Sequence, residues 1–219
     1  SCSLVGSEMC IRDRNNPTGT AKTLLEIKDF LNNLPDDILV FLDQAYYEYI
    51  EGSEFDIPFS LIDDHPNLVI SRSFSKAHGL AALRLGFCVS NPELSDYLNR
   101  VRQPFNANSL ALDLGKVALS DQEHISKSVK INSSGMERVK KAFTNLDYNF
   151  IESWGNFISF DAKQDSDVAF QYFLEKGVIL RSLKVYEMPQ HLRVSIGTEE
   201  EMDFFLQVLE DYEKDLSKK

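Results

Sequence analysis

Four polar clusters lie at or near the ends of predicted strands, and their residue types are those that bind and activate small molecules. In open α/β sheets, ligands bind at the carboxyl ends of the strands. Each cluster alone has an ordinary explanation, since NPTG is typical of a turn and a lone lysine or arginine of the solvated surface. The clusters are Asn15-Asn16-Pro17-Thr18-Gly19, Asp43-Gln44-Ala45-Tyr46, Ser73-Phe74-Ser75-Lys76 and Arg84.

The charge of the chain limits the partners that it can have. The 219 residues carry a formal net charge of -11, and no cluster of lysine and arginine offsets it. Nucleic acid and anionic membranes are therefore poor candidates. An anionic ligand would have to be held by a few local cations, and we expect no metal site.

Cysteine usage and hydropathy favour a soluble protein of a reducing compartment. The three cysteines, Cys2, Cys10 and Cys88, make no disulfide framework. No apolar run approaches the roughly 20 residues that span a bilayer, and the N-terminus lacks the order of a secretory signal. We expect a cytoplasmic protein with a core of ordinary size.

The elements that must position the clusters alternate in the first half of the chain. Residues 21–34 repeat apolar groups at helical spacing, and residues 38–42 form an apolar run typical of a buried parallel strand. Further strands are predicted at 68–70 and 85–89, with Cys88 in the core. This alternation predicts an α/β fold with a mostly parallel sheet. Further helices are expected at 93–102, after an Asn91-Pro92 start, and at 109–119.

The pattern changes in the second half. A long helix over 121–146 could join two domains, and it is followed by short strands at 156–160, 178–181 and 192–196. A helix at 168–176 lies between the first two strands, and Thr198 opens a final helix with a capping box. We therefore predict a partial large domain over 15–120 and a small α+β domain over 121–219 that includes its leading linker helix.

The first 14 residues fit neither domain. They show no period or turn pattern, and they resemble translated sequencing-adapter read-through. We expect a non-native tail, with a disordered native tail as the alternative. The α/β half also starts abruptly before its polar motifs, so we expect its N-terminal part to be missing.

In their order along the chain, the motifs resemble those of the fold-type-I aminotransferases of the aspartate aminotransferase superfamily, and most of all the histidinol-phosphate aminotransferase family. The resemblance extends over about residues 15–212. Gln44 stands where an acidic residue is common, and Ala82 stands where glycine is common; neither position carries chemistry. The matching blocks are NNPTGT, FLDQAYYEY, SRSFSKAHGLAALRLGF, RQPFNAN, GNF and LRVSIGTEEE.

The resemblance implies pyridoxal 5'-phosphate as cofactor. Lys76 would bind its aldehyde covalently and, once freed as a neutral amine, carry a proton. Asp43 would keep the pyridine nitrogen protonated. Tyr46, rather than its neighbour Tyr47, and Asn16 would donate hydrogen bonds to the ring oxygen.

The cofactor phosphate needs a cation and hydroxyl groups. By the resemblance these are the Arg84 guanidinium and the Ser73 and Ser75 hydroxyls, which would face one side of an extended stretch. Asp43, Lys76 and Arg84 should therefore surround a common cavity.

Two further arginines would bind the anionic end of the substrate. The alternation around Arg193 turns its side chain away from the small-domain core, and the family uses arginines at the positions of Arg181 and Arg193. The alternative is a pair of surface ion pairs that contribute about 0–1 kcal/mol each. Asn156 is a weaker candidate, and His78 receives no role.

The resemblance implies that the parent protein transfers an amino group from a small-molecule amino donor, L-histidinol phosphate, to a 2-oxo acid, 2-oxoglutarate. It also implies a role in histidine biosynthesis and a homodimeric assembly. Alternatives are an aromatic or branched-chain aminotransferase, a threonine-phosphate decarboxylase, a non-catalytic aminotransferase-like sensor domain, or an incomplete gene product without function. The family's N-terminal arm, first phosphate loop and ring-stacking aromatic all precede NNPTG. We therefore expect this chain to bind the cofactor poorly and to be weakly active or inactive.

Overall fold

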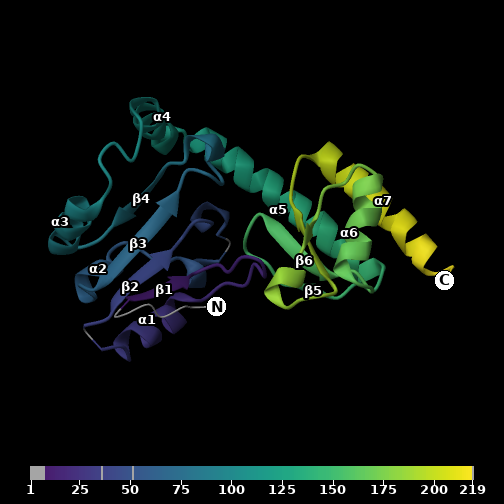
Figure 1. Ribbon diagram of the computed structural model, residues 1–219, viewed down its shortest axis with the longest axis horizontal. Helices are drawn as coiled ribbons and strands as arrows, with labels where there is room; N and C mark the ends of the chain where they lie inside the picture. The colour runs from purple at the N-terminus through teal and green to yellow at the C-terminus, as the bar shows by residue number, and fades with distance from the viewer. Residues whose placement is uncertain (1–7, 36, 51, 219) are drawn as a thin grey trace. The chain divides into compact units, whose positions relative to one another are not determined.

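The computed structural model describes residues 8–35, 37–50 and 52–218 (Figure 1). The chain divides into two compact units: unit 1 is Ser1–Arg14 with Ala21–Ser126, and unit 2 is Asn15–Thr20 with Lys127–Lys219. The division thus falls inside helix α5 (Gln122–Asn145) rather than at residue 120.

The NPTG segment does not belong to the unit in which we expected it. Asn15–Thr20 groups with unit 2, although the sequence placed it in the first domain. The reason is hydrogen bonding: the Trp154 amide donates to the Gly19 carbonyl at 2.9 Å, and the Ser159 hydroxyl donates to the Pro17 carbonyl at 2.6 Å.

Unit 1 contains a four-stranded sheet in the order β1-β2-β3-β4. Its strands are β1 (Glu8–Arg12), β2 (Leu39–Asp43), β3 (Leu68–Ser73) and β4 (Gly86–Val89). The first three are parallel, and β4 is antiparallel to β3. The prediction of an α/β fold with a mostly parallel sheet is therefore confirmed.

Strand β1 occupies a segment that we expected to be a tail. Residues 8–12 pair in parallel register with β2, from Glu8 opposite Leu39 to Arg12 opposite Asp43. A disordered tail is therefore wrong for residues 8–14. The backbone hydrogen bonds of the β2 edge explain the difference, because they accept a neighbouring strand whatever its sequence pattern. Residues 1–7 of the expected tail lie outside the described residues.

Strand β4 differs from the other strands in burial. Cys88 is exposed, so the prediction that it belongs to the core is wrong. Within the part of the chain that the structure describes, β4 pairs with β3 alone, and a strand with one neighbour is covered less than a central one.

The Asn91 cap confirms the predicted start of one helix of unit 1, whereas the helix expected over 21–34 starts at residue 24. Helix α1 (Leu24–Asn32) starts with a Thr23–Glu26 capping box, and the Asn91 side chain caps α3 (Pro92–Val101). Helix α4 spans Ser109–Ser120, and the short α2 spans Leu61–Asp64. Buried residues of α1 and α2 pack against β2 and β3 in one core, namely Ile27, Leu31, Leu61, Ile62, Val40, Leu42, Leu68 and Ile70.

Unit 2 is an antiparallel sheet in the order β5-β6-β8-β7 with three helices. The α5 residues after Ser126, together with α6 and α7, supply aromatic and aliphatic side chains to its core, including Phe143, Phe173 and Phe205. Thr198 and Glu201 form the predicted capping box of α7. The bounds are β5 (Phe150–Ile151), β6 (Phe157–Asp161), α6 (Ser166–Glu175), β7 (Arg181–Ser182), β8 (His191–Ser195) and α7 (Glu199–Leu216).

Among the described residues, no helix is both long and apolar enough to cross a lipid bilayer.

Candidate functional site

Two neighbouring parallel strands of unit 1 bring two of the polar clusters to one edge of the sheet. Asp43 is the last residue of β2 and lies in register with Ser71 of β3. Ser73 ends β3, and Lys76 follows three residues later. Because parallel strands end at the same edge, the Asp43 and Lys76 clusters lie at the ligand-binding edge of this sheet.

Lys76 lies next to Tyr46. The Lys76 ammonium is 5.2 Å from the centre of the Tyr46 ring, and Tyr46 itself is buried. The lysine opens a tight turn in which the Gly79 amide donates to the Lys76 carbonyl at 2.9 Å. Gly79 has a φ of +71°, which favours glycine.

Tyr47 lies in a different environment from Tyr46. Its hydroxyl donates to the Asp56 carboxylate at 3.0 Å, and the centre of its ring lies 3.3 Å from the Arg72 guanidinium carbon. Burial and the Asp56 hydrogen bond raise the pKa of the Tyr47 phenol. Of the two adjacent tyrosines, Tyr46 therefore accompanies the lysine, as the motif predicts.

The Asp43 carboxylate is partly buried and bonded locally. Its Oδ1 accepts from the Ala45 amide at 3.1 Å, and its Oδ2 lies 3.9 Å from Arg12 Nε. The hydrogen bond from the Ala45 amide fixes the Asp43 side chain at the end of β2. A carboxylate held this way can stabilise a protonated ring nitrogen beside it.

Ser73, Ser75 and Arg84 form a second polar group beyond Lys76. The Ser75 amide donates to the Ser73 hydroxyl at 3.0 Å, and the Arg84 guanidinium donates to the Ser75 hydroxyl at 3.5 Å. The expectation of an extended stretch is wrong, because the chain turns directly after Ser73. The turn brings the Ser75 amide to the Ser73 hydroxyl.

This donor set fits the cofactor that the sequence suggests. Two hydroxyls and a guanidinium are the kind of donors that a phosphate group requires. An amine, a phenol and a carboxylate at the same sheet edge match an aldehyde, a ring oxygen and a ring nitrogen. The cavity that we expect around Asp43, Lys76 and Arg84 stays a prediction.

Unit 2 carries the arginines expected to bind substrate. Arg181 of β7 lies directly opposite Arg193 of β8 in the antiparallel register. The Arg193 guanidinium donates to the Asn16 side-chain oxygen and lies 4.8 Å from the Phe157 ring centre. Among the described residues, the buried Arg193 Nε has no hydrogen-bond partner. The hydrogen bond from Arg193 thus orients the Asn16 side chain.

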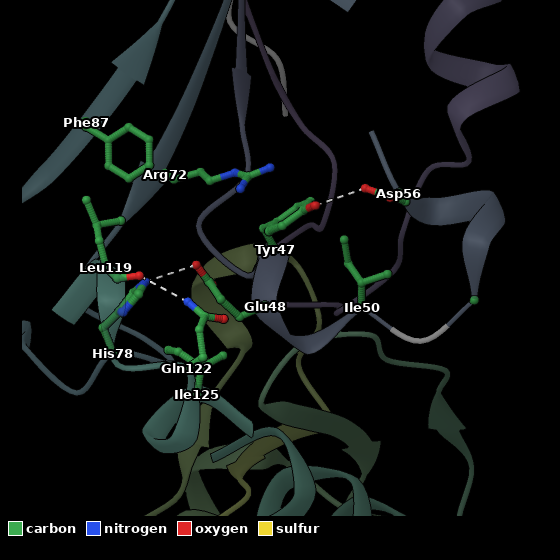
Figure 2. Close-up of a pocket in the computed structure, with 11 residues that line it drawn as sticks. Tyr47, Glu48, Ile50, Asp56, Arg72, His78, Phe87, Leu119, Gln122 and Ile125 are labelled. Atoms are coloured by element: carbon green, nitrogen blue, oxygen red, sulfur yellow. Dashed lines mark hydrogen bonds and ion pairs between the residues drawn. The ribbon is translucent and has the colours of Figure 1, made fainter. Parts of the chain in front are cut away.

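Sequence reasoning missed a buried polar pair in unit 1. His78, to which no role was assigned, places its Nε2 3.4 Å from a carboxylate oxygen of Glu48. Both side chains line a cavity of about 510 Å³, and Figure 2 shows them facing each other across one wall of it. The one available signal was spacing, because Glu48 follows Tyr46 by two residues and His78 follows Lys76 by two.

The charged groups around this cavity are mostly paired. Burial raises the pKa of the Glu48 carboxyl, while the charges of His78 and Arg72 oppose the shift. Arg72 donates to the Gln44 side chain at 3.1 Å and packs on the Tyr47 and Phe59 rings. Gln44, which replaces the acidic residue common in the family, is therefore a buried structural partner. Asp43, Lys76 and Arg84 do not line this cavity.

A comparison with protein families matches residues 9–209 to the model "Aminotransferase class I and II". A histidinol-phosphate aminotransferase 1 of Nitrosococcus oceani is 46% identical over 200 residues, which are 91% of this chain and 54% of that protein. The chain thus spans about half the length of the curated relatives that it matches.

Solved structures share the fold. A histidinol-phosphate aminotransferase of Sinorhizobium meliloti, solved in complex with pyridoxal 5'-phosphate, superposes with a TM-score of 0.87 at 24% identity, over 96% of this chain and 58% of that one. An L-threonine-O-3-phosphate decarboxylase of Porphyromonas gingivalis superposes with a TM-score of 0.80 at 22% identity, over 94% and 64% of the two chains.

Proposed function

The chain belongs to the class I and II aminotransferase family, and from this premise we propose that its parent protein is a pyridoxal-phosphate-dependent transaminase. We propose L-histidinol phosphate and 2-oxoglutarate as its substrates. The substrates are those that the names of relatives such as the Nitrosococcus protein imply. Histidine biosynthesis, a homodimeric assembly and a cytoplasmic location belong to the same proposal.

One observation supports the proposal most strongly: the Lys76 ammonium lies 5.2 Å from the Tyr46 ring, at the sheet edge where Asp43 ends β2. When bound, pyridoxal phosphate supplies an aldehyde that an amine can hold and a protonated ring that accepts electrons from the substrate. In this proposal the Lys76 amine would hold the aldehyde. Once the substrate amine has displaced it, the freed Lys76 amine would move the proton of the substrate α-carbon.

The other residues of unit 1 hold and polarise the cofactor. Asp43 keeps a proton on the ring nitrogen, since an adjacent carboxylate favours the charged form. The Tyr46 hydroxyl donates to the ring oxygen, and the assignment of Asn16 to the same oxygen stays a prediction from the sequence. The Ser73 and Ser75 hydroxyls and the Arg84 guanidinium hold the phosphate. The Arg84 guanidinium already donates to the Ser75 hydroxyl, and the Ser75 amide donates to the Ser73 hydroxyl.

Two arginines of unit 2 bind the anionic end of the substrate in this proposal. Arg181 and Arg193 lie opposite each other, so both guanidinium groups can reach one phosphate or carboxylate. Arginine suits this task because its planar fork of donors matches both anions.

The test is transamination by the full-length parent protein, recovered from its gene. The amino donors to compare are L-histidinol phosphate, aromatic and branched-chain amino acids, and phosphothreonine. We expect glutamate to form from 2-oxoglutarate fastest with L-histidinol phosphate. Replacement of Lys76 by Ala should abolish that rate, while Lys116→Ala, at an exposed lysine of the same unit, should keep it. A fastest rate with another donor would overturn the substrate, and release of carbon dioxide from phosphothreonine would indicate a decarboxylase.

A further inference from the structure

Two contacts join the same two segments of unit 1. The first is that of the Lys76 ammonium with the Tyr46 ring. The second is the polar contact of His78 Nε2 with Glu48 Oε1, at 3.4 Å. Each partner of the second contact lies two residues beyond a partner of the first, so the pair ties together the turn that carries the lysine and the segment that carries the tyrosine.

The His78 side chain is enclosed on several sides. It is 8% exposed, and its ring centre lies 4.9 Å from that of Phe74. Among the described residues, its Nδ1 makes no hydrogen bond, so the contact with Glu48 is the one polar contact that orients the ring. These contacts restrict the position of the His78 side chain, and through it the position of the backbone at residue 78.

The backbone around His78 is the lysine turn itself. The Gly79 amide bonds to the Lys76 carbonyl at 2.9 Å, and the Leu80 amide bonds to the Phe74 carbonyl at 2.9 Å. His78 is therefore inside the loop that these two bonds close. Movement of His78 would shift the peptide groups next to Lys76.

Glu48 is also largely buried, and among the described residues its Oε2 makes no hydrogen bond. Its side chain is 12% exposed, and it belongs to the short helical turn Tyr47–Tyr49 that directly follows Tyr46. A buried carboxylate that loses its hydrogen-bond partner keeps the free-energy cost of desolvation without the compensating interaction. The pair thus resists separation, and Figure 2 shows its two members joined at the cavity wall.

We propose that the buried Glu48–His78 pair is a positioning contact that holds the Lys76 amine beside Tyr46 for its reaction with the aldehyde of pyridoxal phosphate. The inference rests on the proposed function. Glu48 and His78 touch neither the amine nor the cofactor in it; they act through the lysine turn.

The test measures the reactivity of Lys76 against an internal reference. The 219-residue chain is incubated with millimolar pyridoxal phosphate and reduced with borohydride, and pyridoxyl-lysine is quantified at each position by peptide mass spectrometry. The ratio of label at Lys76 to label at Lys116 is the readout. Lys116 is in the same unit, its side chain is 77% exposed and its amine makes an exposed ion pair with Asp113, so it reports the reactivity of a surface amine.

His78→Phe keeps a ring and removes the donor, whereas His78→Gln keeps a donor that can reach Glu48. We expect His78→Phe to lower the ratio about tenfold, because small displacements of a reacting group cost large factors in rate. His78→Gln should stay within about threefold of the wild type, since it retains the hydrogen bond. His65→Phe, a histidine at the end of α2 that does not line this cavity, is the matched control and should change nothing.

A double variant separates positioning from stability. Glu48→Leu with His78→Phe replaces both polar partners by apolar groups, which is often nearly neutral for the free energy of unfolding. We expect its thermal midpoint to recover relative to His78→Phe while its label ratio stays low.

The outcomes are distinguishable. A double variant whose ratio recovers together with its stability would overturn the positioning role, as would an unchanged ratio in His78→Phe. Wild-type chain that labels Lys76 no faster than Lys116 would overturn the proposed cofactor lysine, and the positioning role with it.

Discussion

Arg181 and Arg193 lie directly opposite each other on the adjacent antiparallel strands β7 and β8. Like charges at opposed positions of a sheet destabilise it, so an anion between them would remove a repulsion as well as gain two partners. Arg193 is the better anchored of the two, since it donates to Asn16 and lies over Phe157.

Phosphate binding should therefore depend on both arginines, and more on Arg193. With inorganic phosphate as the probe, we expect Arg193→Gln to weaken binding by the 219-residue chain about 30-fold, or about 2 kcal/mol. Arg181→Gln should weaken it about fivefold, because an exposed cation is screened. Isothermal titration calorimetry measures both constants, and Arg100→Gln in unit 1 is the control. Equal affinity in all four proteins would show that no anion site exists here.

Asp43 should control the rate of the chemical step in the parent protein. Asp43→Asn removes the negative charge that keeps the ring nitrogen protonated, so kcat should fall at least about 100-fold. Asp56→Asn changes a carboxylate of the same unit that bonds to Tyr47 and should leave kcat within about threefold. Steady-state kinetics with histidinol phosphate decide the matter, and an Asp43→Asn rate near that of the wild type would contradict the assignment.

The Asp13–Arg14 pair should make stability depend on pH. Burial raises the pKa of Asp13 from 3.8 to about 6, against the opposing effect of Arg14. Between these values the folded state keeps a proton that the unfolded state has lost, so the free energy of unfolding falls as pH rises from about 4 to 6. The loss is on the order of 1.4 kcal/mol per pKa unit.

Asp13→Asn removes this titration and should flatten the pH dependence of the unfolding midpoint in urea over that range. Asp113→Asn, an exposed aspartate of α4, should reproduce the wild-type slope. The prediction fails if Asp13→Asn and the wild type lose stability in parallel from pH 4 to 6.

Gly19 should tolerate no side chain. It has a φ of +80°, and a Cβ there would overlap the Ser153 hydroxyl. Gly177 also has a positive φ, but its nearest neighbour would be in ordinary contact at 3.8 Å. Gly19→Ala should therefore cost more than the roughly 1–2 kcal/mol of left-handed strain alone, which Gly177→Ala measures. Urea unfolding compares the two, and equal costs would mean that the overlap relaxes freely.

The 219-residue chain alone should transaminate far more slowly than its full-length relatives. It spans 54% of the length of the Nitrosococcus relative. A coupled assay for glutamate formation measures the rate. Turnover comparable to that of a full-length relative would refute the prediction.

Local patterns determined the elements of this protein. The capping boxes at Thr23 and Thr198 and the Asn91 cap mark the starts of α1, α7 and α3. The sequence predicts the Thr198 and Asn91 caps, because in each the cap side chain bonds to a backbone amide three positions along the chain. The order of the polar motifs likewise indicated the family, and placed Asp43 and Lys76 after adjacent strands.

Tertiary structure alone decided which distant segments meet. The antiparallel direction of β4, the pairing of β1 with β2, the grouping of Asn15–Thr20 with unit 2 and the Glu48–His78 pair all join residues far apart in the chain. Strand register and buried polar pairs depend on which surfaces come into contact, and hydrophobic periodicity carries no information on that. The alternation around Arg193 predicted its face, but only the pairing of β7 with β8 placed Arg181 opposite it.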